Sequence, residues 1–240
     1  MKKLLLASLL SAVSFASSAT IVEIKTSQGI IKVNLFDQQT PKTVANFLSY
    51  VGDAAYNQTV IHRSVKDFII QGGGFTYSDG FDRITTKPAV INEPIYSNVK
   101  GTIAMAKLGG NPNSATSQWF FNLKDNSAGN PKLDTQNGGF TVFGQIMDDS
   151  QATLDKIAAL VHCEEVPVVG ITKDQCATIS NVNFVSIDNM YVLDDDPNTA
   201  HDLLPVENTL IGKMSNDSSG SMAWLLGALL LVLPRLKRAK

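Results

Sequence analysis

The sequence contains few cysteines, few histidines and little net charge, and each shortage excludes a class of function. Its 240 residues include two cysteines and three histidines. Their spacing does not supply the four ligands of a structural zinc site, so we expect no metal. The net charge is −2, but six of the 20 basic residues lie at the two ends, which leaves 14 basic against 22 acidic residues in the body. This acidic balance predicts that nucleic acid is not a partner.

Long apolar runs are also missing, because neither of the two longest reaches the roughly 20 residues that a membrane-spanning helix needs. The first run, residues 4–16, follows Lys2 and Lys3 and precedes Ser17-Ser18-Ala19. A basic start, a short apolar run and small residues before a cleavage point are typical of a secretory signal peptide. We therefore predict that residues 1–19 are removed on export to the periplasm and that the mature chain begins at Thr20.

The second run, Met222 to Leu233, is followed by Pro234 and a basic cluster that ends at Lys240. An apolar run before basic residues is typical of a stop-transfer segment. The tail resembles the GlyGly-CTERM sorting signals of Gram-negative bacteria, with Gly220-Ser221 in place of the paired glycines. Residues 222–240 are thus expected to anchor the chain to a membrane or to direct its sorting to the cell surface. Residues 194–221 form the expected linker to this tail.

The two cysteines, Cys163 and Cys176, lie 13 positions apart. An even number of cysteines in an exported chain favours a disulfide. In the chain-entropy description, closing a loop of this size stabilises the fold by roughly 3 kcal/mol. We therefore predict one disulfide between them.

The region between the two ends, residues 20–193, has the pattern of a mainly β domain. Alternating apolar residues on both sides of Ser27-Gln28-Gly29 predict a hairpin. Thr40 and Pro41 predict the start of one helix, and a second is expected to begin near Asp149 or Ser150, with Leu154, Ile157, Ala158 and Val161 on its apolar face. Short β-like runs lie at residues 60–63, 68–71, 102–106, 118–123, 141–147 and 178–187. Many short strands with a helix near each end predict a closed barrel with helical caps.

Arg63 is one of only two arginines in the body and lies in an apolar strand, eight residues before Gln71. A guanidinium among apolar residues is costly unless it has a partner or a ligand. Two interpretations are open on this evidence: an ion pair with a carboxylate across the barrel, or a contact with a substrate.

The surrounding motifs carry a resemblance to a known family. They are Pro41 to Phe47, Ile61-His62-Arg63, Phe68, Gln71-Gly72-Gly73, Phe75, Gly101 to Ala106, Ser114 to Asn122, and Thr141 to Gly144. In this order and spacing, the chain from Ile21 to Val185 resembles the cyclophilin-type peptidyl-prolyl cis-trans isomerases, and most of all their bacterial exported branch. The resemblance implies an eight-stranded antiparallel barrel with two α-helices, and a groove for proline-containing peptides.

The resemblance also implies roles for individual residues. Arg63 would donate to the prolyl nitrogen, Gln71 would bond the substrate backbone, and both would act with Phe68 in catalysis. The other expected binding residues are His62, Ile69, Ala106, Lys107, Gln118, Phe120, Leu133 and Phe140, of which Ala106 and Lys107 would pair through their backbone. No cofactor is implied, the chain is expected to be a monomer, and its substrates would be unfolded or partly folded exported polypeptides.

Three positions depart from the pattern of many eukaryotic members. Lys132 stands where they have tryptophan, Phe140 where they have histidine, and Lys107 where asparagine is common. These departures keep a second hypothesis open, in which the domain binds peptides or acts as a chaperone with little turnover. The presence of Arg63, Phe68 and Gln71 favours the isomerase.

Overall fold

The computed structural model describes residues 20–78, 80–130, 132–196, 199–200 and 203–211. The predicted signal peptide and the predicted tail therefore lie outside the described residues. None of the helices within the described ranges has the length and apolar character that crossing a bilayer requires.

The described chain is mainly β and contains two α-helices, α1 (Pro41–Gly52) and α2 (Gln151–Ala158). Its 13 strands are β1 (Ile21–Thr26), β2 (Gly29–Leu35), β3 (Thr59–Val60), β4 (Arg63–Val65), β5 (Ile69–Gly72), β6 (Phe75–Tyr77), β7 (Phe81–Arg83), β8 (Thr102–Met105), β9 (Trp119–Asn122), β10 (Val142–Ile146), β11 (Val161–Cys163), β12 (Val166–Val168) and β13 (Ser186–Asp194). Four short 3₁₀ helices complete it: η1 (Gln136–Gly138), η2 (Asp148–Ser150), η3 (Lys173–Thr178) and η4 (Asn181–Asn183).

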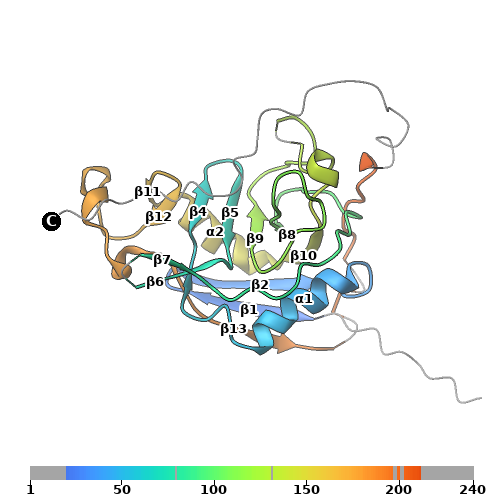
Figure 1. The fold of residues 1–240 in the computed structure, drawn as a ribbon, viewed down its shortest axis with the longest axis horizontal. Coiled ribbons are helices and arrows are strands. Elements are labelled where there is room, and N and C mark those ends of the chain that lie inside the picture. Colours follow the sequence, from blue (N-terminus) through green and yellow to red (C-terminus); the bar gives the residue numbers. More distant parts are fainter. Residues whose placement is uncertain (1–19, 79, 131, 197–198, 201–202, 212–240) are drawn as a thin grey trace, which may run out of the picture.

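Eleven strands form one antiparallel sheet in the order β4-β5-β9-β8-β10-β2-β1-β13-β3-β6-β7. This sheet must curl strongly, because β4 and β3 are far apart in that order yet are joined by only Ile61 and His62 (Figure 1). Within these two residues, the Ile61 N–H bonds to Val185 and the His62 N–H to Gln71. Among the described strands, no ladder joins β4 to β3, β6 or β7. The mainly β fold with two α-helices is confirmed, whereas closure into an eight-stranded barrel is not.

The first hairpin and the first helix begin where the sequence predicts. The β1–β2 register pairs Thr26 with Gly29 across the turn, and the Thr26 hydroxyl donates to the Gly29 carbonyl at 2.7 Å. Helix α1 begins at Pro41, but the Thr40 side chain bonds back to Phe36 rather than capping the helix. The cap comes instead from Glu93, whose carboxylate accepts the Thr43 N–H at 2.9 Å and its hydroxyl at 2.7 Å. A carboxylate is favourable there because the first N–H groups of a helix have no partner within it.

Aromatic side chains fill the main core inside the curled sheet. Phe47 of α1 packs against Phe143 of β10, with ring centroids 5.0 Å apart, and Trp119 of β9 meets Phe121 at 5.3 Å. All four side chains are fully buried. A second, smaller apolar cluster lies around Phe120 and Leu133.

The last strand does not lie where the sequence predicted it. Residues 178–187 were expected to be β, but residues 173–183 mostly form η3 and η4, and β13 runs from Ser186 to Asp194. Two register shifts against β1 break the alternation of buried side chains along β13. Because period-two alternation is the signal of a half-buried strand, these shifts hide β13 from sequence analysis.

Val161, expected on the second helix, belongs to β11 instead. Helix α2 ends at Ala158, and β11 pairs with β12 in a hairpin whose two-residue loop is Glu164-Glu165. Glu164 adopts a positive φ of 58°. Non-glycine residues rarely do so, and no glycine or asparagine marks this turn in the sequence. The predicted disulfide is confirmed: Cys163 of β11 is bonded to Cys176 of η3, with their Cα atoms 5.5 Å apart.

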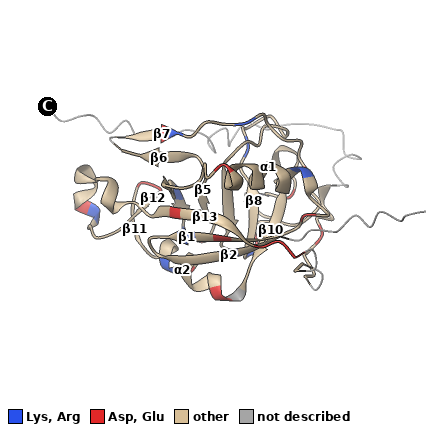
Figure 2. Ribbon diagram, turned by 90° about the horizontal axis from the view of Figure 1, so that it is seen from below, with Lys and Arg blue, Asp and Glu red and all other residues tan. Residues whose placement is uncertain are grey.

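Part of the segment expected to be a linker is packed against the domain. Tyr96 and Glu207 form a β-bridge. The Asn208 N–H donates to the Ile95 carbonyl at 2.8 Å, and Asn208 is only 8% exposed. The Asn208 side chain also donates to the Asp134 carbonyl at 2.8 Å. These contacts are polar, which explains why the apolar pattern did not reveal them. Figure 2 shows Lys and Arg spread over the described ribbon with acidic residues between them.

Candidate functional site

One edge of the Arg63 guanidinium is hydrogen-bonded, and the remaining nitrogen has no partner among the described residues. Its Nε donates to Glu165 Oε2 at 2.5 Å, and its Nη2 to Glu165 Oε1 at 3.5 Å. Nη1 is buried, and no described residue accepts a hydrogen bond from it. The structure therefore contains an ion pair, as one interpretation of the sequence required. Its carboxylate comes from the β11–β12 loop, however, and Nη1 is left without an acceptor among the described residues.

Gln71 lies directly opposite Arg63 in the β4–β5 ladder. Its Nε2 donates to Gln118 Oε1 at 2.8 Å, while its own Oε1 is buried and has no partner among the described residues. A buried acceptor without a hydrogen bond is costly, so such atoms are rare unless a ligand satisfies them. The sheet thus places two groups that are unpaired among the described residues on the neighbouring strands β4 and β5: the donor Arg63 Nη1 and the acceptor Gln71 Oε1.

Five of the apolar residues expected to bind substrate form one cluster. Ile69, Phe120, Leu133 and Phe140 are at most 3% exposed, and they pack with Ala106. The Phe120 and Phe140 rings meet edge to face at 5.8 Å. Phe68 packs at the edge of this cluster and is partly exposed. It also lies 5.9 Å from the Arg63 guanidinium carbon, so it links the apolar cluster to the arginine.

The Lys107 side chain is buried beside the apolar cluster. Its ammonium donates to the Asn137 and Gly139 carbonyls at 2.9 and 2.5 Å. It also lies 4.8 Å from the centre of the Phe140 ring, and burial lowers its pKa to about 8. The side chain therefore holds the η1 loop against the apolar cluster.

Ala106 can use only part of its backbone for a peptide. Its N–H already donates to the Gln118 carbonyl at 2.9 Å. The backbone pairing expected of Ala106 stays a prediction, and its carbonyl is the group that could form it.

The glycines after Gln71 allow close packing beneath the site. Gly73 has a φ of +75°, and a Cβ added there would lie 2.6 Å from Trp119 Nε1 and 2.7 Å from the Ser117 carbonyl. Beside it, Gly74 is covered by the Gln118 side chain, which would lie 2.8 Å from an added Cβ. Side chains at these positions would displace Trp119 and Gln118, and with them the partner of Gln71.

His62 lies beside Arg63 in the chain and packs edge to face against Phe75, at 4.8 Å. Its Nδ1 is buried without a partner among the described residues. The His62 pKa is lowered from 6.5 to about 4. Burial is the main cause, and the positive charges of Arg63 and Arg83 add to it. His62 is therefore neutral at pH 7 and packs as an aromatic ring.

The low pKa of His62 predicts acid sensitivity. Between pH 6.5 and 4 the unfolded chain binds a proton at His62 that the folded protein does not, so this stability is present above pH 6.5 and lost as the pH falls. We expect His62 to account for a loss of about 2 kcal/mol in unfolding free energy between pH 7 and pH 4.5. Urea unfolding at both pH values measures this. The His62→Gln variant should show a smaller loss, and an equal loss would contradict the assignment.

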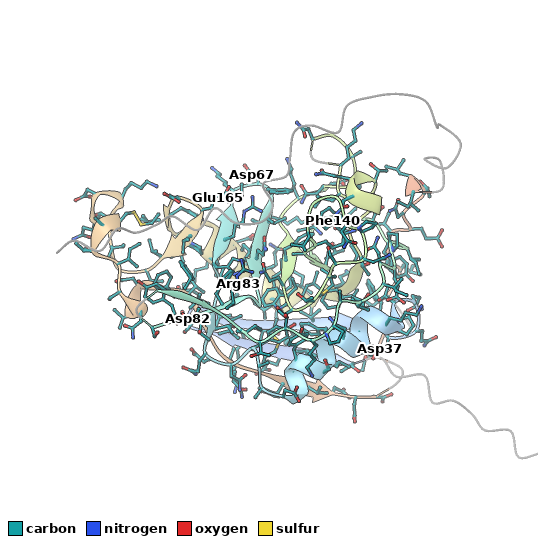
Figure 3. The ribbon with its side chains drawn as sticks, viewed as in Figure 1. Asp37, Asp67, Asp82, Arg83, Phe140 and Glu165 are labelled. Carbon is teal, nitrogen blue, oxygen red and sulfur yellow. A yellow bond between two sulfur atoms is a disulfide. The ribbon has the colours of Figure 1, made fainter. Side chains whose placement is uncertain are left out.

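Sequence analysis missed Glu165, the partner of Arg63. Arg83 lies outside this contact: it is exposed on β7, with its guanidinium carbon 5.3 Å from the centre of the Phe75 ring. Glu165 lies over β4 in Figure 3, on the same side of the molecule as Phe140. In the sequence, only its position two residues after Cys163 pointed to Glu165. The expected disulfide predicts that the backbone near Cys163 is held in place.

Comparisons with known proteins agree on one family. A family model described as "Cyclophilin type peptidyl-prolyl cis-trans isomerase/CLD" matches residues 21–179. The peptidyl-prolyl cis-trans isomerase cyp18 of Streptomyces antibioticus is 44% identical over 139 residues, which cover 57% of this chain and 81% of that protein. Peptidyl-prolyl cis-trans isomerase B of Escherichia coli is 39% identical over 140 residues, with 57% and 83% covered.

The fold has a counterpart among solved structures. A crystal structure of a cyclophilin-type peptidyl-prolyl cis-trans isomerase from Cryptosporidium parvum matches with a TM-score of 0.53 at 24% identity. The match covers 73% of this chain and 98% of that chain. At this identity, the likeness is one of fold.

Proposed function

Because the chain belongs to the cyclophilin-type family and is a peptidyl-prolyl cis-trans isomerase, we propose that Arg63 catalyses the reaction by donating a hydrogen bond to the prolyl nitrogen. One observation carries this proposal: Arg63 Nη1 is buried, charged and without a partner among the described residues, directly opposite Gln71 in the β4–β5 ladder. The alternative, a peptide-binding module with little turnover, has no comparable support from the relatives.

The reaction needs no transfer of atoms. Amide resonance opposes rotation about the Xaa-Pro bond with a barrier of about 20 kcal/mol. As the bond twists, the prolyl nitrogen becomes pyramidal and its lone pair localises. A donor aimed at that nitrogen therefore binds the transition state more strongly than the planar ground state. A guanidinium suits this role because it stays protonated and its donors have fixed directions.

The neighbouring residues provide binding and orientation in this proposal. Gln71, held by Gln118, presents Oε1 to an N–H of the substrate backbone. Phe68 offers its partly exposed ring to the proline at the edge of the Phe120–Leu133 cluster. Anchoring the peptide on both sides of the prolyl bond confines rotation to that bond.

We further propose that the enzyme is exported and acts on Xaa-Pro bonds of exported proteins as they fold. The signal-peptide pattern of residues 1–19, the disulfide and the tail of residues 222–240 support this location. Prolyl isomerisation is slow enough to limit folding in any compartment.

Mass spectrometry of the protein purified from its native cells tests the location. We expect an N-terminus at Thr20, and an intact N-terminus at Met1 would contradict export. A C-terminus near Gly220 would support a sorting signal that is removed. A C-terminus at Lys240 would support a membrane anchor.

A further inference from the structure

The disulfide-linked segment after α2 packs against the strand that carries Arg63. The Ser64 N–H donates to the Glu165 carbonyl at 2.6 Å, which fixes the β11–β12 loop beside β4. Two further contacts hold the β11–β12 hairpin in place: Cys163 is bonded to Cys176, and Val168 forms a β-bridge with Phe184. Figure 1 shows β12 next to β4, on the side away from β5. The loop therefore has a defined position relative to the site.

The two acidic residues of this loop have different surroundings. Glu165 bonds the Nε and Nη2 edge of Arg63. Glu164 borders a cavity of about 350 Å³ beside the disulfide. Adjacent residues of equal charge thus offer a site residue and its matched control.

We propose that Glu165 is a positioning residue for the isomerase reaction. It holds the Nε and Nη2 edge of Arg63, so that Nη1 is the nitrogen directed at the prolyl bond. This inference rests on the proposed role of Arg63. A guanidinium is planar, so fixing one edge with a carboxylate also fixes the direction of the remaining donor.

The exposure of the pair favours orientation over stability as its main effect. The Arg63 side chain is 17% exposed and that of Glu165 is 56% exposed. Ion pairs with an exposed partner add little to folding stability, because solvent screens them and two side chains are ordered. Orientation, by contrast, acts directly on catalysis, because a small displacement of a catalytic group causes a large loss of rate.

The test compares Glu165→Ala with Glu164→Ala in prolyl isomerisation of a short Ala-Pro peptide by the full protein. We expect Glu165→Ala to lower kcat/KM about tenfold, mainly through kcat, because the donor is misdirected while the peptide contacts remain. Glu164→Ala removes the same charge from the same loop and should keep wild-type kinetics. Glu165→Gln keeps one acceptor for Arg63 Nε and should recover part of the activity.

A double variant separates positioning from a structural role. In the Arg63→Ala background, Glu165→Ala should cause no further loss of kcat/KM, because no guanidinium is left to orient. The ¹⁵N signal of Arg63 Nε should shift in Glu165→Ala and stay in place in Glu164→Ala.

Several results would overturn the proposal. Unchanged or faster turnover by Glu165→Ala would show that the carboxylate does not assist Arg63, and an equal loss in both backgrounds would assign Glu165 a structural role. The proposed function has a separate test: wild-type turnover by Arg63→Ala would overturn it. Loss of turnover in Arg63→Ala, with a fully active Glu165→Ala, would overturn only the positioning role.

Discussion

Replacing Arg63 by alanine is expected to lower kcat/KM for an Ala-Pro peptide by about 10²- to 10³-fold, the usual cost of removing one donor to a developing transition-state charge. The loss should fall on kcat, because Nη1 meets the prolyl nitrogen most strongly in the twisted state. The Phe68 and Gln71 contacts remain, so KM should change little. Exchange NMR on the cis and trans peptide signals measures both constants.

Arg63→Lys should not restore activity. An ammonium cannot bond the Glu165 carboxylate through two nitrogens while a third faces the substrate, as the guanidinium does. Arg83→Ala is the matched control, because Arg83 is an exposed arginine on the nearby strand β7. It should keep kcat/KM within about twofold, as expected for a surface substitution away from the site. Wild-type kcat/KM in a folded Arg63→Ala protein would disprove the proposed mechanism.

Asp134→Ala is expected to cause a large loss of stability. The Asp134 side chain is fully buried and accepts bonds from Ser97 Oγ at 2.6 Å, Asn98 N at 2.7 Å and Asn98 Nδ2 at 3.0 Å. Alanine would leave three buried donors without this acceptor, so the free energy of unfolding should fall by about 3–5 kcal/mol. Urea unfolding followed by tryptophan fluorescence measures this loss.

Asp134 should also affect substrate binding, because its neighbours form the apolar cluster. Leu133 precedes it, and Asn98, which it binds, also donates to the Phe140 carbonyl at 3.1 Å. In protein that remains folded, Asp134→Ala should raise KM. Asp125→Ala is the control, since this exposed carboxylate bonds Ser127 two residues further on. It should cost less than about 1 kcal/mol. Equal losses for both variants would refute the predicted role of Asp134.

Local sequence signals predicted the parts of the fold that depend on local structure. The hairpin around Ser27 and the start of α1 at Pro41 follow from turn chemistry and from the fixed φ of proline. The apolar set of Ile69, Phe120, Leu133 and Phe140 followed from a resemblance, and the fold does bring these residues together.

The missed features depend on contacts between distant residues. Glu93 caps a helix 50 residues earlier in the chain, and Glu165 reaches Arg63 across 102 residues. Neither carboxylate lies in a pattern that predicts its partner. The β11–β12 hairpin was missed because its turn uses Glu164 at a positive φ instead of glycine, and β13 because its register shifts break the alternation.

The Glu93 cap also makes the first turn of α1 depend on a segment 50 residues further along the chain. Until the two segments meet, the Thr43 N–H has no carboxylate to accept its hydrogen bond. A peptide limited to Pro41–Gly52 should therefore be less helical at its first turn than α1 is in the folded protein.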